Sequence, residues 1–173
     1  HDKELLAPAQ LAINYIVSAQ DPVGGGWRYQ PQQAGDTSVV GWQLMALKSA
    51  ELAGVEIPTT TREGMIRFVQ SVSSGASNGL ASYRAGERVS RPMTAEALVC
   101  KQFLGIPRQN PASDEAGNFL LGELPGTGER NYYYWYYGTL GMYQLQGEHW
   151  RRWNEALTTQ LLQSQITAGE AAG

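Results

Sequence analysis

The sequence has one cysteine, no long apolar run and little net charge, and each of these absences excludes a class of protein. Cys100 alone cannot form an internal disulfide or a cysteine-rich metal cluster. No apolar stretch approaches the ~20 residues that a transmembrane helix needs. The net charge of −3, without a cluster of Lys and Arg, argues against a nucleic-acid partner. The segment contains no targeting pattern, and its sequence does not indicate a cellular compartment.

Strand patterns are also scarce, whereas helical periodicity recurs along the chain. Apolar residues return every three or four positions, and glycines, prolines and capping residues separate these stretches. A length of 173 residues is enough for one domain with a sizeable core. We therefore predict a single all-α domain over residues 1–173, with helices at residues 4–20, 38–52, 60–72, 92–104, 113–124, 131–146 and 148–165.

Three of the predicted helices end with a glutamine that precedes a loop containing glycine. The three motifs are Ile16-x-x-x-Gln20 followed by Gly25-x-Trp27, Ile66-x-x-x-Gln70 followed by Gly79 and Tyr83, and Leu161-x-x-x-Gln165 followed by Gly169 and Gly173. The predicted helix at 113–124 lacks the glutamine. Repetition in register favours a helical repeat protein.

The first motif follows from simple physical chemistry. A glutamine at a helix C-terminus can hydrogen-bond the unpaired carbonyls there, and its amide can lie against a tryptophan ring. Glycines 24–26 permit a positive-φ path that brings Trp27 back over the end of its own helix. A phosphate-binding loop is the competing interpretation, but no Gly-Lys-Ser/Thr follows the glycines and no strand precedes them.

The stretch from Ile16 through Gln20 to Trp27 resembles the QW repeat of squalene-hopene and oxidosqualene cyclases, whose architecture the protein prenyltransferase β-subunits share. A second stretch, Asn131-Tyr-Tyr-Tyr-Trp-Tyr-Tyr-Gly continuing to Trp150-Arg-Arg-Trp-Asn154, is similar to a pattern of bacterial proteins with prenyltransferase/squalene-oxidase repeats. The resemblance implies an α/α-toroid, in which outer and inner helices alternate. The outer helices would be 4–20, 60–72, 113–124 and 148–165, and the inner ones 38–52, 92–104 and 131–146.

A closed toroid of this family holds more helix pairs than this chain supplies. The resemblance therefore implies a partial arc of about seven helices that belongs to a longer parent protein. A complete, irregular helical domain is the alternative.

The cyclases carry their proton donor in an Asp-x-Asp-Asp-Thr-Ala motif that opens an inner helix. The matching stretch here is Gln33-Ala34-Gly35-Asp36-Thr37-Ser38, in which Gly35 stands at the position of the acid. Protonating an alkene needs a strongly polarised carboxylic acid, which Asp36 beside a glycine does not provide. We interpret Asp36 as the N-cap of helix 38–52, worth ~1 kcal/mol, and only as a weak catalytic candidate.

The prenyltransferases hold zinc through an aspartate, a cysteine and a histidine. In this chain Cys100 lies in an apolar run and His149 starts a predicted outer helix, so the required three ligands do not converge. We expect no metal and no cofactor. Helical toroids that act on carbohydrates use paired carboxylates, and the candidates near inner-helix entrances show no spacing that brings two together. These candidates are Asp36, Glu87, Glu96 and Glu129.

The six consecutive aromatic residues 132–137 indicate a binding surface. On a helix they point in all directions, so some pack against neighbours while others face the concave interior. We predict an aromatic floor formed by Tyr132, Tyr133, Trp135 and Tyr136. The predicted charged rim, at the same end, comprises Tyr83, Arg84, Arg91, Glu129 and Arg130, with Arg28 and Tyr29 beside them.

These expectations favour a non-catalytic binding domain of the squalene cyclase/prenyltransferase repeat type. Its ligand would be apolar or amphipathic, such as an isoprenoid-like molecule, or a peptide segment of a partner. The first alternative is part of an active isoprenoid cyclase or prenyltransferase whose catalytic residues lie outside this chain. The second alternative is a carbohydrate-active helical toroid.

The zinc expectation can be measured directly. Purified protein should contain no stoichiometric zinc, because Cys100 and His149 cannot form a site by themselves. Metal analysis that finds about one zinc per chain, lost in Cys100→Ser, would contradict this expectation.

Overall fold

The computed structural model describes residues 3–169, and this part of the chain is all-α apart from one short ribbon. The helices are α1 Lys3–Ser18, α2 Thr37–Leu52, α3 Thr59–Val72, α4 Arg91–Phe103, α5 Pro111–Leu121, α6 Tyr132–Leu145 and α7 Gly147–Ser164. The ribbon, which was not predicted, pairs β1 Ser73–Ser74 with β2 Leu80–Ala81 in antiparallel register. The all-α prediction is confirmed. None of the helices described is long and apolar enough to cross a membrane.

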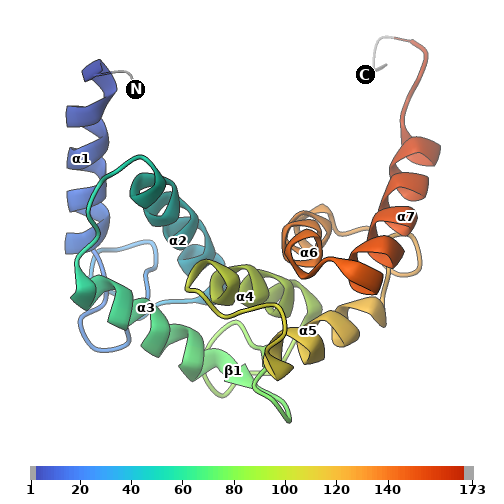
Figure 1. Cartoon of the computed structure of the whole chain (residues 1–173), viewed down its shortest axis with the longest axis horizontal. Helices are drawn as coiled ribbons and strands as arrows, with labels where there is room; N and C mark the ends of the chain where they lie inside the picture. Colours follow the sequence, from blue (N-terminus) through green and yellow to red (C-terminus); the bar gives the residue numbers. More distant parts are fainter. Residues whose placement is uncertain (1–2, 170–173) are drawn as a thin grey trace.

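The helices form two layers of an open arc (Figure 1). Helices α1, α3, α5 and α7 lie on the outside of the arc, and α2, α4 and α6 lie on its inside. Helices α1 and α7 lie at the two tips of the arc. Helix α4 is central, because it packs against α2 on one side and α6 on the other, with α3 and α5 behind it.

Each inner helix begins with a side-chain cap. Asp36 accepts a hydrogen bond from the Val39 N–H at the start of α2, Ser90 from Met93 at α4, and Asn131 from Tyr134 at α6. Such caps satisfy amide groups that have no partner within the helix. The interpretation of Asp36 as an N-cap is therefore confirmed.

The glycine loop lies between α1 and α2 in the chain and packs against α3. Gly25 has φ +79°, and a Cβ on it would overlap the Gly64 carbonyl of α3, so both the conformation and the close approach require glycine. Trp27 is 2% exposed, and its Nε1 donates to the Ile16 carbonyl at 2.7 Å. The expected return of Trp27 over the end of its own helix is confirmed.

The expectation for Gln20 was wrong in its partners. Helix α1 ends at Ser18, so Gln20 lies just beyond it. Its Nε2 donates to the Gly25 carbonyl at 2.8 Å and to the Thr61 carbonyl at 3.1 Å, instead of the carbonyls of its own helix. The amide therefore ties the glycine loop to the first turn of α3.

The core consists of two clusters that share α4. One cluster joins α1, α2 and α3 and includes Trp27 and Cys100, which is a buried apolar residue as expected. The other joins α4, α5, α6 and α7 around Leu98 and Trp153. Two glycines of α6 face different helices: Trp153 of α7 packs on Gly138, and Leu98 of α4 packs on Gly141.

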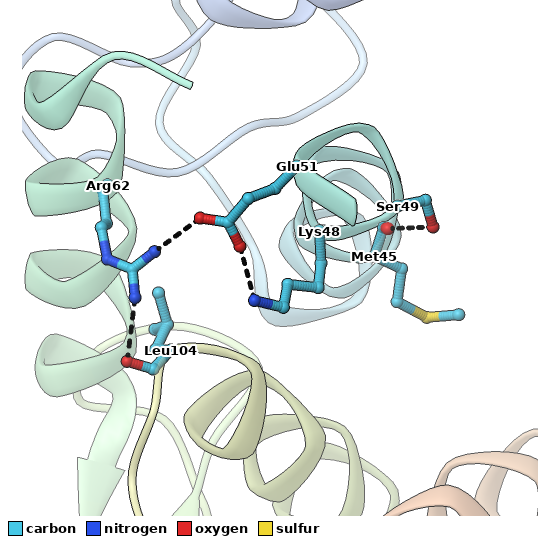
Figure 2. Close-up of polar contacts among 6 residues, drawn as sticks. All are labelled: Met45, Lys48, Ser49, Glu51, Arg62 and Leu104. Atoms are coloured by element: carbon cyan, nitrogen blue, oxygen red, sulfur yellow. Dashed lines mark hydrogen bonds and ion pairs between the residues drawn. The ribbon is translucent and has the colours of Figure 1, made fainter. Parts of the chain in front are cut away.

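Polar side chains connect the ends of three helices (Figure 2). Arg62 of α3 donates to Glu51 Oε1 of α2 at 3.3 Å and to the Leu104 carbonyl after α4 at 3.4 Å. Lys48 pairs with the other oxygen of Glu51. These residues are partly exposed, so the network orients the helix ends and contributes little to stability.

Replacing Trp27 tests how far the arc depends on the glycine loop. We expect Trp27→Ala to lower the free energy of unfolding by ~3 kcal/mol or more, because it deletes a buried ring and a hydrogen bond. The matched control is Trp42→Ala, since Trp42 is 52% exposed and should cost much less. Urea unfolding of both variants measures the difference, and equal losses would contradict the prediction.

Candidate functional site

The N-terminal halves of the three inner helices meet around Glu96 of α4. Its side chain is fully buried, and the Tyr133 hydroxyl of α6 donates to its Oε2 atom. On the other side, Gly41 of α2 faces the carboxyl group so closely that a Cβ there would overlap Oε1. The N-terminal halves of the three helices thus converge, with a carboxyl group at the point where they meet.

Burial decides the charge of this carboxyl group. Desolvation raises the pKa of Glu96 to about 7, although Tyr133 and Tyr137 lower it, and the charge of Asp36 raises it further. Glu96 Oε1 and the Tyr137 hydroxyl are both buried without a hydrogen-bond partner among residues 3–169. The Tyr137 hydroxyl is itself a donor and favours the carboxylate, so it is burial that shifts Glu96 toward its neutral form.

Asp36 is a second buried acid among the inner-helix starts. Its Oδ1 accepts from the Ser38 hydroxyl at 2.8 Å and from Val39 N at 3.0 Å. Its Oδ2 lies 3.7 Å from Arg28 Nε. Tyr83 lies beside it, and the pKa of Tyr83 is raised by burial and by Asp36. The predicted rim residues Arg28 and Tyr83 therefore both lie beside Asp36. One carboxylate oxygen of Asp36 caps α2, and the other faces the Arg28 guanidinium.

An exposed aromatic surface crosses the concave side of α4. Trp42 of α2 stacks on Tyr136 of α6, with ring centroids 6.1 Å apart and planes 18° from parallel. Because α3 and α5 occupy the outer side of α4, a pair that spans from α2 to α6 lies on the inner side. Trp42 is 52% exposed, Tyr136 44% and Tyr132 56%. We call these three residues the concave aromatic surface.

The aromatic floor differs from its prediction in two residues. Tyr132 and Tyr136 are exposed on the concave aromatic surface, as expected, whereas Tyr133 turns toward Glu96. Trp135 is 5% exposed and belongs to the core, where its ring meets the edge of Tyr132 at 5.2 Å. The expectation that Trp135 forms the floor is wrong, because successive helical residues point about 100° apart.

The predicted rim residues do not all lie at one place. The Arg91 guanidinium lies 4.8 Å from the centre of the Phe119 ring of α5 and pairs with Glu123 at 3.1 Å. It therefore faces the outer layer, which corrects its predicted place on the concave rim. Arg84 lies over Tyr83 at 5.6 Å. Glu129 and Arg130 are exposed in the loop before α6.

The later glutamines are more exposed than Gln20. Gln70 is exposed, and its side chain lines a cavity between α3 and α5. Gln165 follows the end of α7 and is exposed as well. Gly169 has φ +87°, whereas the predicted Gly173 lies outside the described residues.

Sequence reasoning missed Trp42 and Tyr137 as members of the site. The buried stripe of α2 runs through Val40, Leu44 and Leu47, and Trp42 falls off this stripe. A large aromatic residue on the polar side of a helix was the available signal. Tyr137 gave no comparable signal, because its contact with Glu96 depends on how α4 and α6 pack.

The site contains ionisable groups but no cluster typical of a metal centre. Within residues 3–169, no group of three or more His, Cys, Asp and Glu side chains is placed to hold a metal ion. The site thus consists of a buried acid, two tyrosine hydroxyls and an exposed aromatic pair.

Comparison of this chain with models of protein families, with curated proteins and with solved structures finds no match.

Proposed function

We propose that this chain is a non-catalytic binding domain of the squalene cyclase/prenyltransferase repeat type. In this proposal the arc is part of an α/α-toroid, and the concave aromatic surface binds an apolar or amphipathic ligand or a protein segment. The observation that carries it is the half-exposed stack of Trp42 on Tyr136, on the side of α4 that no outer helix covers.

The chemistry of the surface supports an amphipathic ligand. Two nearly parallel rings offer a flat apolar area, and the Trp and Tyr edges keep polar atoms at its border. The three inner helices bring their N-termini to the same region, where their dipoles place partial positive charge. An apolar body with an anionic head matches both features.

Two further observations support the toroid part of the proposal. Outer and inner helices alternate along the whole arc, as the resemblance implies. Exposed apolar residues lie on the two terminal helices, with Leu5 and Leu11 on α1 and Leu162 on α7. Surfaces of this kind are typical of contacts with further protein, which in this proposal is the remainder of the parent protein.

Glu96 favours an active isoprenoid enzyme as the second candidate. A carboxyl group whose pKa is near 7 keeps its proton in about half of the molecules at neutral pH, so Glu96 can serve as a general acid, although it is a weaker acid than alkene protonation requires. The side chain is fully buried, however, so a substrate reaches it only if Tyr133 or Tyr137 moves aside. Asp36 is equally buried, which leaves no exposed carboxylate pair there for carbohydrate hydrolysis.

Ligand binding can be tested by tryptophan fluorescence with farnesyl diphosphate as the probe. We expect saturable quenching, and an affinity at least about tenfold lower in the double variant Trp42→Phe with Tyr136→Ala, because the stacked surface is lost. The matched control is Trp150→Phe with Tyr143→Ala, which removes another aromatic pair at 5.2 Å, between α6 and α7. Unchanged affinity in the first variant, or equal loss in both, would contradict the proposal.

The charge of Glu96 predicts a dependence of stability on pH. The folded-state pKa of about 7 lies above the usual 4.5, so the folded protein binds the extra proton between these values. Stability should therefore fall as pH rises from 5 to 8, by about 2–3 kcal/mol. Glu96→Gln, which is neutral at every pH, should abolish most of this fall. Urea unfolding at several pH values measures it, and an identical profile in both proteins would refute the assignment.

A further inference from the structure

A cavity on the outer side of α4 contains a buried lysine that the concave site does not use. The cavity has a volume of about 450 Å³ and lies between α3, the start of α5 and the end of α4. This volume is within the range of about 300–1,000 Å³ that small-molecule sites occupy. Its floor includes Val69 and Lys101, which are 5% and 7% exposed, whereas Ile66 and Ile106 are exposed at its rim.

Lys101 is held in this cavity by a loop that a carboxylate organises. The carboxylate of Glu115 accepts hydrogen bonds from the backbone of Ala76 at 2.7 Å, Ser77 at 3.0 Å and Gly79 at 2.7 Å. The loop thereby aims the Asn78 carbonyl at Lys101, whose Nζ donates to it. Glu115 is thus already occupied by three amide donors, and Lys101 binds a neutral oxygen.

Among the described residues the ammonium group therefore forms no direct ion pair, and the charge of Glu115 stabilises it only from a distance. Among the lining residues that the structure describes, Lys101 is the only one with an ionisable side chain. It forms one hydrogen bond with the residues described, and two of its three protons remain available. Burial lowers the pKa of Lys101 to about 8, although Glu115 of α5 and Cys100 of α4 act in the opposite direction. At pH 7 the group is still mostly protonated.

We propose that this cavity binds a small amphipathic carboxylate. Its carboxylate head would pair with the Lys101 ammonium, and its alkyl chain would lie against Ile66, Val69, Leu104 and Ile106. A charged partner for a buried ammonium removes the cost of leaving that charge unpaired. The apolar lining contributes through the area that the chain removes from water. This inference does not depend on the concave aromatic surface.

The chain contains three lysines, which makes the test direct. Protein labelled with ¹³C at the lysine Cε gives three signals, and Lys101→Met identifies the signal of Lys101. Sodium octanoate at pH 7 should shift that signal saturably and raise the pKa of Lys101. The affinity should fall up to about 30-fold between pH 7 and pH 9.5, as the ammonium is lost. Lys101→Met should weaken binding at least about tenfold.

The controls distinguish an ion pair at Lys101 from nonspecific adsorption of an amphiphile. n-Octanol, which lacks the charge, should bind much more weakly than octanoate, and equal binding would overturn the proposal. Unchanged octanoate affinity in Lys101→Met, or equal shifts at Lys3, Lys48 and Lys101, would do the same. The Trp42→Phe with Tyr136→Ala variant should keep octanoate binding, whatever the outcome with farnesyl diphosphate.

A second pair of variants avoids the buried core. Ile106 is 38% exposed at the rim, so Ile106→Glu and Ile106→Gln should both fold. The added carboxylate should repel the anion, and we expect octanoate affinity to be at least about fivefold lower in Ile106→Glu than in Ile106→Gln. Equal affinities in the two variants would overturn the proposal even if Lys101→Met does not fold.

Discussion

The complete burial of α4 is the constraint on which the rest of the arc depends. Every residue from Met93 to Lys101 is buried, so this helix has no solvent face along those nine positions. A helix in such a place needs neighbours all round, and α2, α6 and the outer helices α3 and α5 provide them. Both core clusters include residues of α4. The arc therefore keeps its core because its central helix is enclosed by its neighbours.

Burial on all sides forces the polar residues of α4 to find partners, and each one finds a different neighbour. Thr94 accepts a hydrogen bond from Ala81 N of the ribbon at 3.0 Å. Glu96 is bound by Tyr133 of α6, and Lys101 by the Asn78 carbonyl of the loop. Since a buried polar group without a partner is costly, these three contacts specify the position of α4 relative to its neighbours more strictly than apolar packing alone.

Local sequence signals predicted the helices, but the chemistry of the site depended on long-range packing. Helices follow from apolar spacing and caps, and Asp36 shows both signals within a few residues. Trp27 could be predicted for the same reason, since Gly25 and Ile16 are close to it in sequence. Glu96 was a candidate from its place near a helix entrance, but the burial of Glu96 and Lys101 could not be predicted, because a charged residue in a helical pattern normally faces water. Their burial follows from the enclosure of α4, which no short motif encodes.

Close helix contacts explain why Glu96 is buried on α4. Gly41 lets the Glu96 carboxyl group lie directly against α2, and Gly141 lets α6 approach α4 through Leu98. A side chain at either glycine would push the neighbouring helix away and open the carboxyl group to water. Glu96 and Lys101 are five positions apart, which places them about 140° apart around the helix. One charge therefore points to the inner layer and the other to the cavity between outer helices, and burial draws both toward their neutral forms. The protonation of α4 thus changes between about pH 7 and 8 on two sides of the same helix, and each side borders a different candidate binding surface.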